Sequence, residues 1–175
     1  SGGHTDLILM KGDYQFEHIG GTLDDAIGEC YDKVARVIGL GYPGGPKVEK
    51  AALEGEHTYD LPIPMNDDSF NMSFSGLKSS IINLVHNEKQ RGNEVRNNDL
   101  ARSFQDVAVD QLCRKTELAI KKYGVKNMII AGGVSANKYL RGEIKKVTDK
   151  YNVDLCVPSF VYCTDNAAMI GAAAY

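Results

Sequence analysis

The segment from residue 127 onward alternates between short apolar runs and helical periodicity, and this alternation constrains the fold more than any other feature of the sequence. Residues 127–131 have the composition of a buried strand, two glycines follow, and 135–149 has the apolar period of a helix. A second strand is expected over 153–157 and a second helix from about Thr164. This order of strand, helix, strand and helix predicts a parallel α/β sheet with right-handed crossovers.

The first part of the chain predicts a hairpin followed by helices. Residues 6–10 form an apolar run that ends at a turn, and 14–19 can form the returning strand. Helical spacing of apolar residues begins at Thr22, which forms an expected capping pair with Asp25, and should end near Gly39. Further helices are expected over 48–53, 77–87 and 98–123, and an irregular stretch over 55–72.

Composition and charge exclude several classes of protein. With 175 residues, of which 43% are apolar and 25% charged, a single domain can bury a self-sufficient core. The net charge of -3 argues against a chain that coats nucleic acid unaided, because phosphate binding draws on an excess of Lys and Arg. The four cysteines form no C-x-x-C pair, which fits a reducing cytoplasm. No apolar run approaches the ~20 residues that cross a bilayer, so no membrane partner is expected.

Two glycine loops have the form of phosphate-binding turns. One is SGGHT at 1–5, beside the first expected strand, and the other is AGGVSAN at 131–137, between a strand and a helix. Paired glycines let backbone N–H groups approach an anion, and a helix N-terminus adds partial positive charge. A Gly-Gly pair can also simply turn a strand into a helix. Two such loops at the carboxyl ends of parallel strands favour a nucleotide held between them.

Acidic residues at helical spacing provide a second candidate binding feature. Asp25, Glu29 and Asp32 are four and three residues apart, which places their carboxylates on one face of the first expected helix. A carboxylate in that position can accept hydrogen bonds from ribose hydroxyls. A solvated helix face explains the same pattern, and Asp25 near the start of the helix is expected to act as a cap.

Two other positions invite a chemical interpretation. Asp165 stands at a strand-to-helix junction, where its carboxylate can cap the helix or bind a metal. Ser75 lacks the strand-turn-helix context that exposes a serine nucleophile, so helix capping is its expected role. The four histidines have no ligand-like spacing, and no metal role is predicted for them.

Five blocks, in order across nearly the whole chain, resemble the signature motifs of the TsaD family, formerly described as O-sialoglycoprotein endopeptidases or glycoproteases. They are SGGHT at 1–5, TLDDAIGECYDKVARVIGLGYPGGP at 22–46, FSGLK at 74–78, AGGVSAN at 131–137 and CTDNAAMIG at 163–171. The resemblance implies an α/β domain with the actin-like ATPase (ribonuclease H-like) fold and a mixed, partly parallel sheet flanked by helices. It also implies that 1–175 is a single nucleotide-binding lobe, a C-terminal fragment truncated at both ends relative to the full-length family.

The same resemblance implies a function. Members of this family transfer a threonylcarbamoyl group from threonylcarbamoyl-adenylate to the exocyclic amine of the adenosine next to the tRNA anticodon. The chain would then be part of a cytoplasmic acyltransferase that binds tRNA, partner proteins of the threonylcarbamoyl-transfer complex, and other subunits in homo- or heterodimers. A non-catalytic interaction lobe and a metallopeptidase, as in the older family description, remain as alternatives.

The motifs also imply roles for individual residues. Asp165 would be the family's ligand to a divalent metal, iron or zinc, but the family's two other ligands, an H-x-x-x-H pair before SGGHT, are absent from this sequence. We therefore expect the isolated chain to lack the metal and to be inactive. Glu49 stands where many relatives have Asp. The residues expected to bind threonylcarbamoyl-adenylate or an adenine nucleotide are Ser1, Gly2, Gly3, Asp32, Gly45, Glu49 and Asn137.

Overall fold

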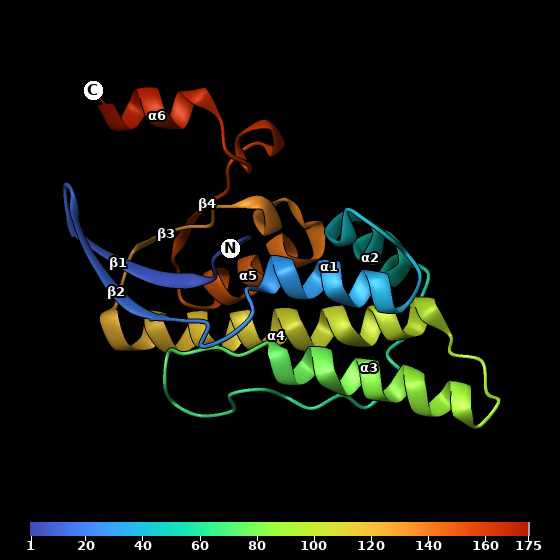
Figure 1. Ribbon diagram of the computed structural model, residues 1–175. Helices are drawn as coiled ribbons and strands as arrows, with labels where there is room; N and C mark the ends of the chain where they lie inside the picture. Colours follow the sequence, from blue (N-terminus) through green and yellow to red (C-terminus); the bar gives the residue numbers. More distant parts are fainter. Residues whose placement is uncertain (175) are drawn as a thin grey trace.

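The computed structural model describes residues 1–174, in which one long helix forms the centre of the molecule (Figure 1). This helix, α4, has α1, α2 and α5 on one side and α3 on the other in the view of Figure 1. The elements in chain order are β1 (Asp6–Gly12), β2 (Gln15–Gly21), α1 (Ile27–Val37), α2 (Gly44–Leu53), α3 (Ser75–Gln90), α4 (Asn97–Tyr123), β3 (Asn127–Ile129), the 3-10 helix η1 (Gly133–Ala136), α5 (Lys138–Lys150), β4 (Asp154–Cys156), the 3-10 helix η2 (Phe160–Tyr162) and α6 (Ala167–Ala174).

The strands form both expected kinds of pairing. β1 and β2 are an antiparallel hairpin, and β3 pairs with β4 in parallel, with Asn127 opposite Asp154 and Ile129 opposite Cys156. The hairpin and the parallel pair predicted from the sequence are confirmed. Within residues 1–174 these pairs are two separate two-stranded sheets, one antiparallel and one parallel, so both kinds of strand pairing expected of the fold are present.

An apolar cavity separates the two strand pairs. It has a volume of about 970 Å³ and is lined by β1, the C-terminal part of α4, β3 and the first half of α5. Several large apolar side chains of the strands are exposed, among them Ile8, Met10 and Ile129. The cavity lies between β1 and β3, which are not hydrogen-bonded to each other.

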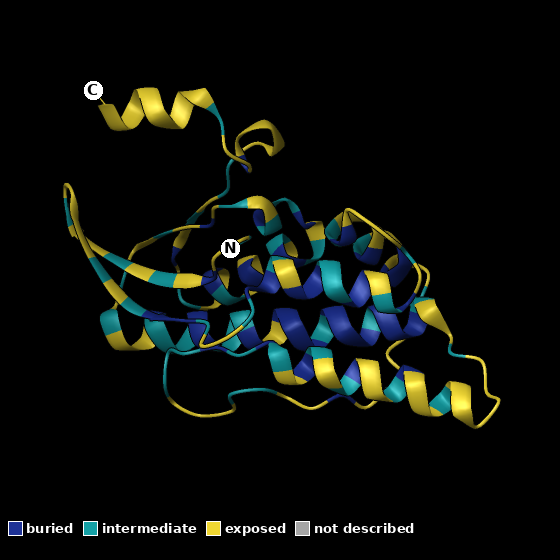
Figure 2. Cartoon of the chain, viewed as in Figure 1, coloured by how far each residue is buried: buried dark blue, intermediate teal, exposed yellow. Residues whose placement is uncertain are grey.

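The hydrophobic core is built mainly from helices. Figure 2 shows buried residues along α4 and on the facing sides of α1 and α2. Tyr31 of α1 meets Phe104 of α4 edge-on, with 4.9 Å between ring centroids, and both side chains are fully buried. A smaller cluster forms between α4 and α5, where Val109 packs with Leu140 and Ile144. The apolar stripe that predicted the helix over 98–123 therefore faces other elements on more than one side.

The start of α1 differs from the sequence-based expectation. The helix begins at Ile27, because the Thr22 hydroxyl donates to the backbone carbonyl of Asp25 at 2.7 Å and forms a turn before it. The first turn of α1 is capped from elsewhere in the chain, since the hydroxyl of buried Thr5 accepts a hydrogen bond from the N–H of Ile27 at 3.0 Å. The predicted capping pair of Thr22 and Asp25 is wrong because a tertiary cap replaces a local one.

Other boundaries shift by a few residues. α2 begins at Gly44, four residues before the expected start at 48, and α5 begins at Lys138 after the turn η1. The last helix begins at Ala167, three residues after the expected start. The end of α4 is confirmed, since Gly124 has a left-handed φ of 60° and its N–H donates to the carbonyl of Ile120.

Asp24 caps α3 across a large separation in sequence. Its carboxylate accepts hydrogen bonds from the backbone N–H groups of Phe74, at 2.8 Å, and Ser75, at 3.1 Å. It also accepts from the hydroxyls of Ser73 and Ser75, at 2.5 and 2.6 Å. The expected capping role of Ser75 is therefore wrong: Ser75 is the first residue of α3 and donates to the residue that caps it.

We expect Asp24→Asn to lower the free energy of unfolding by about 1 kcal/mol at pH 7, the usual size for an exposed helix cap. Partial burial disfavours the charged carboxylate, but the hydrogen bonds from Ser73, Ser75 and the backbone outweigh it and lower the pKa of Asp24 to about 2. A carboxyl group with a lowered pKa in the folded state stabilises the fold above its unfolded pKa, about 3.9. That stability is lost as pH falls through the folded pKa.

Urea unfolding at pH 7, 4 and 2.5 measures this contribution. The difference between the wild-type chain and Asp24→Asn should shrink as the pH falls. A difference that stays constant from pH 7 to pH 2.5 would contradict a charged cap.

Candidate nucleotide-binding site

The two glycine loops that the sequence singles out lie against each other. The backbone nitrogen of Ser1 donates to the carbonyl of Ala131 at 2.7 Å, and the N–H of Val134 donates to the carbonyl of Ser1 at 3.2 Å. Segments 1–5 and 131–137 therefore form one continuous backbone surface between β1, β3 and the start of α5.

The contact between the loops depends on glycine at two positions. Gly132 has a φ of +89°, and a Cβ there would lie 2.1 Å from the carbonyl oxygen of Ser1. A Cβ on Gly28, in the first turn of α1, would lie 2.6 Å from the carbonyl oxygen of Gly2, which accepts a hydrogen bond from the N–H of Gly28. The start of α1 is thereby held directly against SGGHT, a role for Gly28 that no sequence pattern indicated.

A second set of glycines faces open space. A Cβ on Gly3, Gly45 or Gly133 would meet no atom within 4 Å. Within the described part of the chain, the N–H groups of Gly3 and Gly133 form no hydrogen bond. The Ser135 hydroxyl in the same turn is fully buried, and it too has no partner among residues 1–174. Backbone donors that are open on one side and carry no Cβ provide the geometry that an anion requires.

Asn137 has a structural role that the motif did not indicate. It is the N-cap of α5: its side-chain oxygen accepts from the N–H of Leu140 at 2.8 Å, and its amide nitrogen donates to the Gln105 side-chain oxygen at 3.0 Å. Both side chains are buried. Asn137 therefore anchors AGGVSAN to α4, and contact with an adenylate stays a prediction.

Asp32 and Glu49 each use one carboxylate oxygen to fix a helix start. Asp32 Oδ1 accepts a hydrogen bond from the N–H of Gly44, at 2.7 Å, at the beginning of α2. Glu49 Oε1 accepts from the N–H of Lys138, at 2.6 Å, at the beginning of α5. Both residues are half-buried. Glu49 of α2 thus links this helix to the start of α5. Direct ligand contacts of Asp32 and Glu49 stay predictions.

The three acidic residues do not form one site, because Asp25 precedes α1 and only Glu29 and Asp32 lie in this helix. Asp25 forms ion pairs with Lys33, at 3.1 Å, and with Lys78, at 2.5 Å, and the hydrogen bond from Lys78 lowers the pKa of Asp25. Glu29 also pairs with Lys33, at 2.5 Å. Only Asp32 reaches the glycine-rich segment at the start of α2. The solvated-face interpretation is accordingly appropriate for Glu29, and Asp25 is an ion-pair partner of the FSGLK block.

Sequence reasoning missed the residues that hold the loops in place. Thr5 caps α1, and Gln105 orients the Asn137 amide. Gln105 had a detectable signal, because it is a polar residue within the buried stripe of α4. The role of Thr5 had no local signal, since its partner Ile27 lies in a different element.

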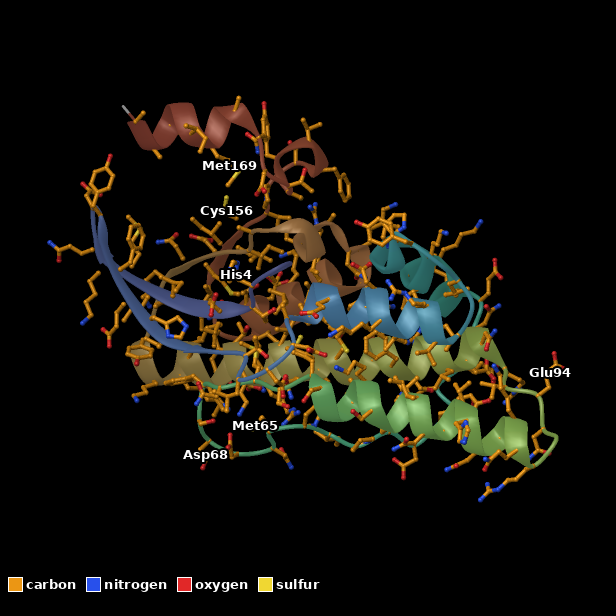
Figure 3. All side chains as sticks on the ribbon, viewed as in Figure 1. His4, Met65, Asp68, Glu94, Cys156 and Met169 are labelled. Atoms are coloured by element: carbon orange, nitrogen blue, oxygen red, sulfur yellow. The ribbon has the colours of Figure 1, made fainter. Side chains whose placement is uncertain are left out.

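Asp165 is exposed in the segment between η2 and α6. Figure 3 shows this part of the chain, with Met169, standing away from the helices. Among the residues that the structure describes, no three His, Cys, Asp or Glu side chains lie close enough together to hold a metal ion. One carboxylate is too few donors for an iron or zinc site, so the described residues do not by themselves fit the expected metal.

One further property concerns membranes. None of the helices in residues 1–174 is both long enough and apolar enough to span a bilayer.

Antiparallel and parallel strand pairs with helices on both sides of α4 make this an α/β protein, the mixed character expected of the actin-like ATPase fold. Solved structures of HypF share this fold at 19% sequence identity. HypF in its phosphate- and nucleotide-bound form has a TM-score of 0.57 over 80% of this chain and 18% of that protein. HypF of T. kodakarensis has a TM-score of 0.61 over 92% of this chain and 20% of that protein.

Residues 1–172 match the family model of TsaD, tRNA N6-adenosine threonylcarbamoyltransferase, and the chain belongs to this family. The relative from Staphylococcus carnosus, which bears that name, is 53% identical over 100% of this chain and 51% of its own length. Relatives of the same name from Listeria welshimeri and Mesoplasma florum are 54% and 51% identical, over 99% and 100% of this chain and 51% and 56% of their own lengths. The chain spans about half the length of the curated relatives it matches. The resemblance stated from the five motifs is confirmed.

Proposed function

We propose that this chain is the nucleotide-binding part of a transferase that moves a threonylcarbamoyl group from threonylcarbamoyl-adenylate to the exocyclic amine of the adenosine next to the tRNA anticodon. The observation that carries this proposal is the direct contact of SGGHT with AGGVSAN, which presents open backbone donors from both loops. The names of the relatives supply the reaction class. They lend no support to an interaction lobe or a peptidase.

The chain would hold the adenylate through backbone and carboxylate groups. The N–H groups of Gly3 and Gly133 would donate to the phosphate, and the Gly45 backbone leaves space for the nucleoside beside α2. The second carboxylate oxygen of Asp32 could accept from a ribose hydroxyl, as acidic residues do in other nucleotide sites. Glu49 and Asn137 would act indirectly, since both hold the start of α5 in place.

The proposed reaction breaks the bond between the carbamoyl carbon and the phosphate oxygen. The adenosine amine attacks the carbonyl carbon, a new N–C bond forms, the amine loses a proton, and AMP leaves. Negative charge grows on the departing phosphate, so donors fixed around that phosphate stabilise the transition state more than the ground state. The glycine loops are suited to this task because their donors are held by backbone contacts and need no rearrangement.

Other parts of the proposal concern the longer protein. An iron or zinc ion bound by Asp165 would need donors from outside residues 1–174, and no step above depends on it. We also propose tRNA as substrate, which the names of the relatives support. Partner proteins of a threonylcarbamoyl-transfer complex, homo- or heterodimers and a cytoplasmic location are further parts of the proposal.

Titration calorimetry with AMP tests the binding step. We expect the chain to bind AMP, and Gly3→Val to weaken this binding at least about tenfold, because a branched side chain fills the space beside the open N–H. Gly142→Ala is the control: a Cβ there meets no atom within 4 Å, and the position lies inside α5, outside both glycine loops. Absence of AMP binding at millimolar concentration would overturn the proposal, and so would equal affinities of the wild-type chain and Gly3→Val.

A further inference from the structure

Arg141 of α5 contacts two separate segments of the chain, the AGGVSAN turn and residues 158–163. Its Nε donates to the carbonyl of Ser135 at 2.5 Å, inside the AGGVSAN turn. Its Nη2 donates to the carbonyl of Pro158 at 3.0 Å and to the sulfur of Cys163 at 3.1 Å. The guanidinium carbon also lies 4.3 Å from the centre of the Phe160 ring. One side chain therefore joins the glycine turn to the segment that leads to Asp165.

The segment after β4 has few other attachments. Every other hydrogen bond within 158–174 joins two residues of that same segment, so Arg141 supplies all the hydrogen bonds that link it to the rest of the described chain. In Figure 3 the side chains of α6 point largely into open space, and the residues of α6 are exposed. Cys163, which precedes α6, is buried, and its sulfur lies against Arg141.

We propose that Arg141 is a positioning residue that fixes the Asp165-bearing segment relative to the AGGVSAN turn. Combined with the proposed function, this means that the nucleotide cradle and the segment carrying Asp165 keep one mutual arrangement during the reaction. Arginine suits this role because its planar guanidinium donates in several fixed directions and also stacks on an aromatic ring. Lysine offers a single flexible ammonium group and cannot reproduce that geometry.

Hydrogen exchange followed by mass spectrometry tests the proposal in the ligand-free chain. We expect Arg141→Ala to accelerate exchange about tenfold in two regions, 158–164 and 133–137, because local opening follows the loss of the contacts that close a segment. Methylguanidinium at millimolar concentration should restore protection in both regions, whereas methylammonium should not. Lys145→Ala, one turn further along α5 with an exposed side chain, is the matched control and should leave both regions unchanged.

AMP affinity provides the second readout. Arg141→Ala should weaken AMP binding about fivefold, at the lower end of typical coupling between sites, and Arg141→Lys should recover little of it. Unchanged exchange in 158–164 would overturn the proposal, and so would faster exchange there without any change in 133–137. If the wild-type chain fails to bind AMP, the proposed function falls, while the exchange and rescue results still decide the role of Arg141.

Discussion

Gly132→Ala is expected to separate the two glycine loops and to lower the free energy of unfolding by about 2 to 6 kcal/mol. Two costs add at this position. An L residue at a φ of +89° is strained by about 1–3 kcal/mol. A Cβ that would lie 2.1 Å from the Ser1 carbonyl oxygen forces the backbone apart, at a further cost typical of overpacking, about 1–3 kcal/mol. AMP binding should be lost together with the contact.

Gly133→Ala is the control for stability, since a Cβ there meets no atom within 4 Å and the residue has no positive φ. Its unfolding midpoint in urea should match that of the wild-type chain, although we expect weaker AMP binding because Gly133 belongs to the proposed cradle. Equal stability of Gly132→Ala and Gly133→Ala would show that the contact between the loops does not form in solution.

Features that depend on local spacing could be predicted from the sequence. The apolar stripe over 98–123 predicted α4 within one residue at its start, and Gly124 marked its end. The apolar run over 127–131 and the one that follows α5 predicted a parallel pair, although the strands are shorter than expected. α4 buries the stripe that predicted it. β3 is not the buried strand that its composition predicted, because Ile129 is exposed, and the parallel pair is held by its backbone hydrogen bonds.

Features that depend on distant partners could not be predicted. Thr22 and Asp25 form a plausible capping pair in the sequence, but Thr5, far away along the chain, supplies the cap of α1. Ser75 likewise resembles a cap, although Asp24 holds the start of α3. The preference for Ser, Thr, Asp or Asn at helix starts says which side chains can accept the first N–H groups. It does not say whether the acceptor lies next to the helix or far away in the sequence.

The candidate site shows the same division. The paired glycines predicted a nucleotide held between SGGHT and AGGVSAN, and the structure brings the two loops into contact. The expected position of SGGHT at the carboxyl end of a parallel strand is wrong, because this loop precedes β1 of the antiparallel hairpin. Asn137 and Glu49 also lie at this site, but both bond to the start of α5 in the described part of the chain. A binding motif therefore contains residues that hold a loop in place as well as residues that would touch a ligand.

The irregular stretch over 55–72 is held by polar groups on α4 that no periodicity could reveal. Lys115 is 1% exposed, and its ammonium donates to the Ser69 carbonyl at 2.8 Å and to the carbonyl and carboxylate of Asp67 at 2.9 and 2.7 Å. Gln111, fully buried one turn earlier, donates to the Pro64 carbonyl at 2.7 Å. A lysine and a glutamine within an apolar stripe would ordinarily weaken a helix prediction. Here the two residues provide the partners that an extended segment without secondary structure needs.

Lys115→Met should therefore lower the free energy of unfolding by about 2 to 3 kcal/mol, since methionine keeps the apolar packing but leaves loop acceptors without their donor. The hydrogen bond from Lys115 lowers the pKa of Asp67 to about 2, so this pKa should rise toward its ordinary value in the variant, as NMR titration would show. Limited proteolysis should cut the variant faster within 62–71. Lys121→Met, on the same helix with a side chain 53% exposed, is the matched control and should change neither stability nor cleavage. Equal stability of the two variants would contradict this role of Lys115. The loop would then be held by apolar contacts, such as that of buried Leu61, and the hydrogen bonds of the Lys115 ammonium would only offset the cost of burying its charge.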